Sequence, residues 1–174
     1  MRRSIYRTRK VTALLIILWA ITAALFRSGH LILNTTGSVP RGLWWVSGGL
    51  LQRGDIVTVP ISAFRSTSWV PKAYWRKNAW GKPKAFLKRV AGIPGDTIEA
   101  GEYELIRVAG EVVPNSAPLS EDRVGRTLKV FQLPVVLASD EVWLLSDSHR
   151  GFDSRYLGPA WIEECHKAIS LAVF

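Results

Sequence analysis

One lysine in this chain has apolar neighbours that could make its amine reactive. Lys88 lies between Leu87 and Val90 in an apolar stretch, residues 86–93, that ends in a Pro-Gly turn. If the side chain is drawn into a core, its ammonium loses water, which lowers the pKa and lets the amine act as a general base. The alternative is an ordinary surface lysine on a two-faced strand with Arg89 as its neighbour, and this segment alone favours that alternative.

A serine in a glycine- and proline-rich turn supplies the nucleophile that such a base would serve. Ser38 lies in residues 34–45, Asn-Thr-Thr-Gly-Ser-Val-Pro-Arg-Gly-Leu-Trp-Trp. Gly37, Pro40 and Gly42 predict a turn that exposes the serine hydroxyl with its backbone N–H free. Because an isolated hydroxyl is a poor nucleophile at neutral pH, it needs a base beside it.

Two further motifs complete a series in a fixed order. Gly-Asp-Ile-Val at residues 54–57 lies between the serine and the lysine, and Asp-Ser-Arg at 153–155 follows both. The full order is Ser-x-Pro-x-Gly-Leu, Gly-Asp-Ile-Val, Lys-Arg-Val-x-Gly-x-Pro-Gly-Asp and Asp-Ser-Arg. These four motifs, in this order over residues 34–158, resemble those of the signal peptidase I superfamily. The chain looks closest to the TraF-type peptidases of conjugative transfer, which process pilin precursors. The resemblance implies a coiled β-fold and a Ser/Lys dyad that cleaves an exported precursor.

The resemblance also assigns roles to individual residues. Ser38 matches the nucleophile and Lys88 the general base. A hydroxyl two residues before the nucleophile, here Thr36, would hold the oxyanion together with the Ser38 N–H, although Thr36 is also explained as a turn threonine bonded to backbone. Asp153 matches an aspartate counted among the functional residues of TraF-type enzymes, and a pair with Arg155 would order the site.

A second base stays open on residue types alone. His149 with Asp147 or Asp153 would supply a Ser-His-Asp arrangement, and the relatives in the eukaryotic endoplasmic reticulum use histidine. The position that matches the family's base is nevertheless Lys88.

The chain departs from the leader-peptidase pattern at two positions. Val39 stands where those enzymes usually carry methionine, which would reshape the mouth of the pocket but not the nucleophile. Gly151 stands where they carry a serine whose hydroxyl contacts the lysine. What orients Lys88 is therefore open, and Ser146 and Ser148 are the hydroxyls that could substitute.

The N-terminus predicts a membrane anchor. Residues 1–10 hold five basic residues and no acidic one, so they supply more than half of the net charge of +9, and the balanced remainder does not call for nucleic acid. An apolar run follows, and with residues 31–33 it gives an anchor at 11–33. The charge bias places the N-terminus in the cytoplasm and residues 34–174 outside. A cleaved signal with its small-residue site at 22–24 is the alternative.

These features predict a single-pass protein of the inner membrane with a periplasmic catalytic domain. Ser38 begins only a few residues past the apolar run, close to the membrane surface. We therefore expect the lipid bilayer and a precursor or pilin presented at the membrane as partners, and no nucleic acid.

Outside the anchor the chain predicts a mainly β fold, with one coiled-sheet peptidase domain at residues 34–174. Short β-branched segments are bounded by Gly, Pro, Asn or Asp, and no window keeps a period of 3.6. The expected strands are residues 43–46, 55–59, 86–93, 97–98, 104–108, 111–113, 128–131, 134–137 and 141–145.

Residues 61–85 mix aromatic and basic side chains. Such a segment could contact lipid headgroups, pack its aromatics on the body, or bind single-stranded nucleic acid by stacking. The predicted anchor favours the first two equally over the third. The side chains concerned are Trp69, Tyr74, Trp75 and Trp80 with Lys72, Arg76, Lys77, Lys82 and Lys84.

Neither a disulfide nor a metal is expected. Cys165 is the only cysteine and predicts a packed small hydrophobe, while His30, His149 and His166 lack ligand spacing, so we expect no cofactor. Two other classes compete with a peptidase. One is a non-catalytic membrane-tethered β-domain that scaffolds a secretion or transfer complex. The other is a self-cleaving repressor, which would need a DNA-binding domain where the apolar segment lies.

Overall fold

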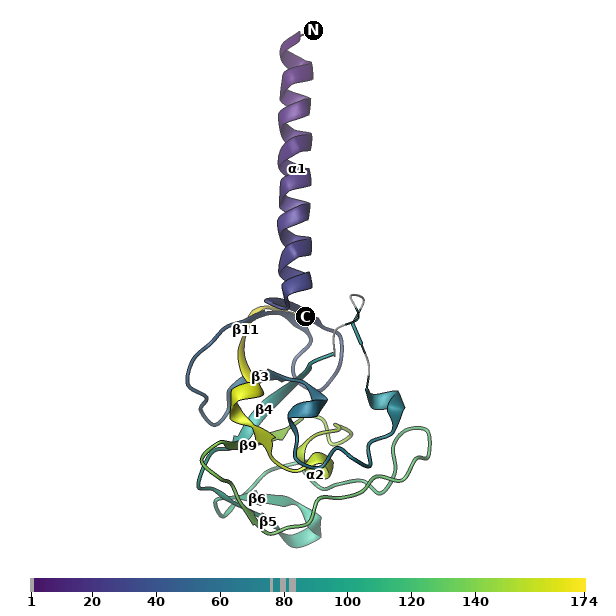
Figure 1. Cartoon of the computed structure of the whole chain (residues 1–174), viewed down its shortest axis with the longest axis vertical. Helices are drawn as coiled ribbons and strands as arrows, with labels where there is room; N and C mark the ends of the chain where they lie inside the picture. The colour runs from purple at the N-terminus through teal and green to yellow at the C-terminus, as the bar shows by residue number, and fades with distance from the viewer. Residues whose placement is uncertain (1, 76, 79–80, 82–83) are drawn as a thin grey trace.

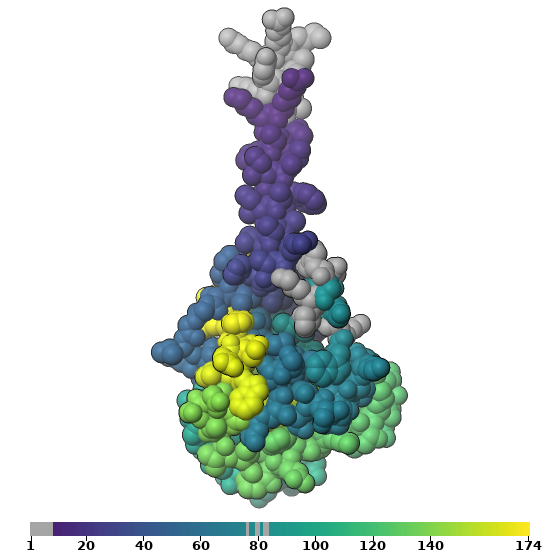
Figure 2. Space-filling view, viewed as in Figure 1, coloured from purple at the N-terminus to yellow at the C-terminus, as the bar shows by residue number. Residues whose placement is uncertain are grey.

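A long helix stands clear of a β-rich body in the computed structural model (Figure 1). The structure describes residues 2–75, 77–78, 81 and 84–174, with side chains from Arg9 onward. Helix α1, Arg2–Ser28, has 27 residues and therefore spans about 40 Å. Its segment Arg9–Ser28 has a mean hydropathy of 2.0 and is long and apolar enough to cross a membrane, as a signal sequence also would be. Figure 2 shows this part of the helix uncovered by the body.

Seven antiparallel strands form the main sheet. Their order is β1-β2-β11-β3-β4-β9-β10, so the C-terminal strand β11 lies between two early ones. Register shifts in β11 and β4 mark β-bulges, which bend strands and curl a sheet. The bounds are Leu31–Asn34 (β1), Gly42–Val46 (β2), Ile56–Val59 (β3), Phe86–Gly92 (β4), Glu141–Leu145 (β9), Ala160–Trp161 (β10) and His166–Val173 (β11).

A smaller antiparallel sheet and several short helices complete the body. The small sheet has the order β7-β6-β5-β8 and lies at the end of the body far from α1 (Figure 1). Its strands are Thr97–Ala100 (β5), Ile106–Val108 (β6), Glu111–Val112 (β7) and Val135–Val136 (β8). The short helices are α2, Ser154–Leu157, and 3-10 turns at Ile61–Ala63, Lys72–Tyr74, Glu102–Glu104 and Ile162–Glu164.

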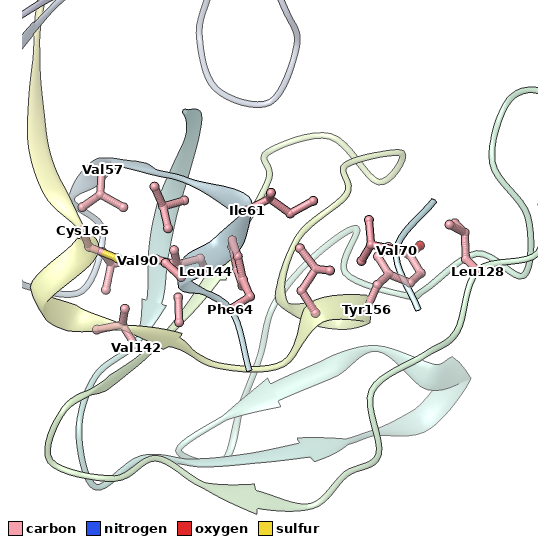
Figure 3. Packing of buried hydrophobic residues seen from close by; sticks show 14 residues of the cluster. Val57, Ile61, Phe64, Val70, Val90, Leu128, Val142, Leu144, Tyr156 and Cys165 are labelled. Carbon is pink, nitrogen blue, oxygen red and sulfur yellow. The ribbon is translucent and has the colours of Figure 1, made fainter. Parts of the chain in front are cut away.

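Strand β9 separates two hydrophobic cores. Successive side chains of a strand point to opposite faces. Val142 and Leu144 therefore enter the main core under β3, β4 and α2, part of which Figure 3 shows. Trp143 and Leu145 enter the core of the small sheet. All five residues of β9 are buried, so this strand and its neighbour β4 form a rigid centre.

The mainly β prediction is confirmed, with differences at particular segments. Residues 31–33, expected in the anchor, belong to β1 and pair with β2. Residues 128–131 form no strand. Gly42, expected to fix a turn, lies in β2, where a Cβ would fall 2.0 Å from the Ala172 carbonyl oxygen. Glycine is needed there for the close approach of β11.

Within residues 61–85 the described aromatics pack on the body. The ring centroids of Trp69 and Tyr74 lie 6.0 and 4.2 Å from that of Phe152, and both side chains pack against the main core. This favours the packing interpretation for these two residues. The expected roles of Arg76, Trp80 and Lys82 lie outside the described residues.

Cys165 is a buried member of the main core. Burial, with a smaller contribution from the Glu164 carboxylate, raises the pKa of its thiol to about 12. The thiol therefore stays protonated at neutral pH, and its Sγ lies 3.4 Å from the Trp161 carbonyl oxygen. This fits the predicted role of a packed small hydrophobe.

Candidate active site

Lys88 is buried in the centre of the main sheet. It lies on β4 opposite Val57 of β3, and its side chain is 1% exposed. Burial lowers the pKa of its ammonium to about 8, against an opposing, smaller effect of the Asp153 carboxylate. Nζ also lies 5.5 Å from the centroid of the Phe86 ring. A surface position, the alternative from sequence, is therefore wrong.

A serine hydroxyl holds the amine of Lys88. Nζ donates a hydrogen bond to Oγ of Ser146, with a distance of 2.6 Å. The register pairs Arg89 with Leu145, so one further step along β4 and β9 brings Lys88 opposite Ser146. Of the two candidate substitutes, Ser146 therefore contacts the lysine. The Ser148 hydroxyl instead accepts from the Arg150 backbone N–H, at 3.3 Å.

The Ser38 turn is organised by a buried asparagine. Asn34, at the end of β1, is 6% exposed. Its Nδ2 donates to the carbonyl oxygens of Thr36, Val39 and Pro40, each at 3.0 Å, and its Oδ1 accepts from the Thr36 N–H at 3.1 Å. Sequence reasoning missed this role, although an asparagine two residues before a turn residue is typical of an Asx turn.

The Thr36 hydroxyl lies beside that of Ser38. Thr36 Oγ1 donates to Asn34 Oδ1 at 2.8 Å and lies 3.3 Å from Ser38 Oγ. In the alternative from sequence the hydroxyl of a turn threonine bonds to backbone, whereas in the structure it contacts two side chains. The Thr36 hydroxyl therefore lies close to Ser38, but its one proton is directed to Asn34 in this structure.

Residues 146 and 147 connect the serine turn to the lysine strand. The Asp147 N–H donates to the Ser38 carbonyl oxygen at 2.8 Å, while the adjacent Ser146 holds Lys88. Arg89, the residue after the lysine, forms a two-pronged pair with the Asp147 carboxylate, with both distances 2.8 Å. The Ser38 turn, β4 and the end of β9 are therefore held as one unit.

Asp153 and Arg155 form a buried ion pair behind this unit. Their side chains are 0% and 1% exposed, and two guanidinium N–H groups reach the carboxylate at 2.8 Å. Arg155 also donates to the carbonyl oxygens of His149 and Gly151, each at 2.9 Å. Asp153 accepts from the Ser146 N–H at 2.9 Å. The pair thus orders the loop that presents Ser146, as the Asp-Ser-Arg motif led us to expect.

The histidine alternative receives no support from this geometry. His149 is exposed, and its Nε2 accepts from Arg150 Nε at 3.3 Å. Both carboxylates that would serve it, Asp147 and Asp153, are paired with arginines.

The two Gly-Asp motifs form ion pairs that support the strands beside Lys88 and do not contact Lys88 itself. Asp55 pairs with Lys167 of β11 at 2.8 Å, and its backbone carbonyl accepts from the Val90 N–H. Asp96 pairs with Arg53 at 2.9 Å. These contacts fix β4 between its neighbours, which explains why the motifs accompany the lysine.

Comparison with known proteins identifies the family of the chain. Residues 5–172 match a family model described as signal peptidase, peptidase S26. The chain is similar to the plasmid transfer protein TraF of Escherichia coli, with 32% identity over 134 residues, 72% of each protein. It is also similar to the probable conjugal transfer protein TraF of Sinorhizobium fredii (strain NBRC 101917 / NGR234), with 33% identity over 147 residues, 80% of this chain and 73% of that one.

A solved structure gives a weaker match. A signal peptidase I from Enterococcus faecalis V583 aligns with a TM-score of 0.44 and 18% identity, covering 71% of this chain and 100% of that one. The family model, which covers nearly the whole chain, identifies the protein as peptidase-like. The chain belongs to the signal peptidase S26 family, and the resemblance to TraF expected from its motifs is confirmed.

Proposed function

We propose that this protein is a membrane-anchored serine endopeptidase that uses Ser38 and Lys88 to cleave an exported precursor, such as a pilin precursor in conjugative transfer. The observation that carries the proposal is a lysine amine buried at the centre of the sheet, held by a hydroxyl, with a pKa lowered to about 8. The two relatives named for plasmid or conjugal transfer support the biological setting.

The lowered pKa makes the lysine a usable base. With a pKa of about 8, about one amine in ten is neutral at pH 7. At the ordinary lysine value, roughly one in three thousand would be neutral, so burial raises the concentration of the base about 300-fold. A scaffolding domain, the alternative from sequence, has no use for a buried lysine that costs folding free energy.

Acylation follows from these two groups. Neutral Lys88 takes the proton of the Ser38 hydroxyl as Oγ attacks the scissile carbonyl carbon. The Ser38 N–H donates to the oxyanion of the tetrahedral intermediate, and the Thr36 hydroxyl joins it once its proton turns from Asn34 Oδ1 toward the oxyanion. When the C–N bond breaks, the Lys88 ammonium returns its proton to the leaving amine. In deacylation Lys88 deprotonates a water that attacks the ester, and the proton then restores the Ser38 hydroxyl.

A groove at the base of α1 suits a precursor presented by a membrane. It has a volume of about 780 Å³, and its lining includes residues 26–33, Trp45 and Ala85. β1 leads from one wall to the Ser38 turn, and residues 84–85 lead from the other to Lys88. Neither Ser38 nor Lys88 is among the residues that line the groove. We therefore propose that the part of the precursor next to the membrane, and not the cleaved bond itself, lies here, with α1 in the inner membrane.

Precursor processing in cells tests the catalytic assignment. The chain is co-expressed with a pilin precursor from a conjugative system, and processing is followed by pulse-chase. Ser38→Ala should abolish processing while membrane level and thermal stability stay nearly unchanged, because a half-buried hydroxyl in a surface turn contributes within about 0.5 kcal/mol. Ser62→Ala, at an exposed serine, is the matched control. Wild-type processing by Ser38→Ala would refute the nucleophile assignment.

Topology is tested separately. A C-terminal reporter should be active only if it is one that works outside the cytoplasm, because the basic N-terminus is expected to stay inside. The mature protein should keep its N-terminal residues. An N-terminal sequence beginning near Leu25 would replace the anchor by a removable signal.

A further inference from the structure

Positions 146 and 151 direct side chains to one point beside Lys88. A Cβ built on Gly151 would fall 2.0 Å from Oγ and 2.1 Å from Cβ of Ser146, and 3.0 Å from Oδ2 of Asp153. The backbone of Gly151 has no positive φ that would demand glycine. Glycine is therefore required at 151 because Ser146 fills the space that a side chain there would occupy.

The hydroxyl in that space serves the lysine. Ser146 Oγ accepts from Lys88 Nζ at 2.6 Å, the one hydrogen bond found for this amine within the described part of the chain. A hydroxyl oxygen accepts from an N–H of both the amine and the ammonium, so it orients the group throughout its titration. With one N–H directed to Ser146, rotation about the Cε–Nζ bond is restricted, which fixes where the lone pair of the neutral amine points.

Ser146 is itself held from behind. Its N–H donates to Asp153 Oδ2, and that carboxylate is fixed by the buried pair with Arg155. The Ser146 hydroxyl is therefore rigid enough to hold the Lys88 amine in one position.

We propose that Ser146 is the positioning residue of Lys88, and that 146 and 151 are alternative, mutually exclusive sources of one hydroxyl. The inference rests on the proposed function. A serine at 151 should take over the contact once position 146 is emptied, so the two residues should be exchangeable as a pair and not singly.

Four variants test this exchange in precursor cleavage by the full chain in detergent. Ser146→Gly should lower kcat roughly 10²-fold with little change in KM, because a misdirected base is the defect. Gly151→Ser alone should also be impaired, because two side chains would compete for one space. The double variant Ser146→Gly/Gly151→Ser should recover to within about tenfold of wild type. Ser148→Ala, on the same loop, should stay within about twofold.

A readout independent of proteolysis separates this inference from the proposed function. The Lys88 amine is titrated by NMR of full-length protein carrying ¹³C-labelled lysine, with Lys88→Met identifying its signal. In Ser146→Ala the pKa should fall by on the order of one unit, because the ammonium loses an acceptor. The double variant should restore it.

The outcomes are distinct. If wild type cleaves no precursor but Ser146→Ala still moves the Lys88 pKa, the proposed function fails while the contact stands. If Ser146→Ala leaves both kcat and the Lys88 titration unchanged, the positioning role is refuted. A folded double variant no better than its singles would refute the exchange. Should the double variant not fold, the Ser146→Ala titration still decides the positioning role.

Discussion

Replacing the buried lysine should remove activity and yet stabilise the fold. Burial lowers the pKa of Lys88 from its ordinary 10.5 to about 8. Each unit corresponds to about 1.4 kcal/mol, so the ammonium destabilises the folded state by about 3 kcal/mol at neutral pH. Lys88→Met fills the same space without charge. The substitution leaves the Ser146 hydroxyl without its partner, which costs about 1 kcal/mol. The free energy of unfolding of Lys88→Met at neutral pH should therefore exceed that of wild type by about 2 kcal/mol.

The stability difference between Lys88→Met and wild type should depend on pH. Between about pH 8 and 10.5 the unfolded chain binds more protons at this residue than the folded chain does. Wild-type stability should therefore rise with pH across that window, and below pH 8 the full destabilisation remains. Because Lys88→Met lacks the titrating group, its advantage should be largest at pH 7 and vanish by about pH 10.

The assay is urea unfolding of the detergent-solubilised full chain at several pH values. Lys129→Met, at an exposed lysine, is the matched control and should show no such pH-dependent difference from wild type. A Lys88→Met variant that is less stable than wild type at pH 7, or whose difference does not change with pH, would refute the buried-ammonium argument.

Three further predictions concern the base, the serine turn and the sheet. Cleavage rate should rise with pH and level off above about 8, as the Lys88 amine becomes neutral. Lys88→Arg should be inactive because arginine cannot give up a proton near neutral pH, whereas His149→Ala should keep most activity. A pH–rate series of the three proteins checks this, and activity that survives in Lys88→Arg but is lost in His149→Ala would transfer the base to the histidine. Asn34→Ala should lower the free energy of unfolding by roughly 2 kcal/mol and reduce kcat, since buried carbonyls lose their donor; unfolding and kinetics measure this, and unchanged kcat would exclude a role in the turn. Gly42→Ala should destabilise by at least about 2 kcal/mol through its clash with β11, whereas Gly48→Ala, with open space around it, should be near neutral in the same unfolding measurement.

Local patterns predicted the strands of the candidate site. The apolar neighbours of Lys88 and the Pro-Gly turn after it were sufficient to predict β4, and short β-branched segments bounded by turn residues predicted most of the remaining strands. Hydropathy could not distinguish residues 31–33 from the end of an apolar helix, because both are runs of leucine and isoleucine. Pairing with β2, which only the fold provides, decides that they form β1.

Contacts between distant segments could not be predicted. The sequence showed that Gly151 lacks a family hydroxyl, but choosing Ser146 over Ser148 requires the register between β4 and β9, 58 residues apart. Gly42 was assigned to a turn because its close neighbour, Ala172, is at the other end of the chain. Asn34 was within the motif, yet its three carbonyl partners appear only when the turn closes.

The short junction between helix and sheet has a consequence for substrate choice. Only Gly29 and His30 separate α1 from β1, and two residues extend at most about 7 Å. With α1 in a bilayer, the height of Ser38 above the lipid is set by the sheet and not by a flexible tether. A peptide bond of the substrate would then be selected by its distance from the membrane as much as by the side chains around it. Precursors with dissimilar sequences but the same spacing would be treated alike.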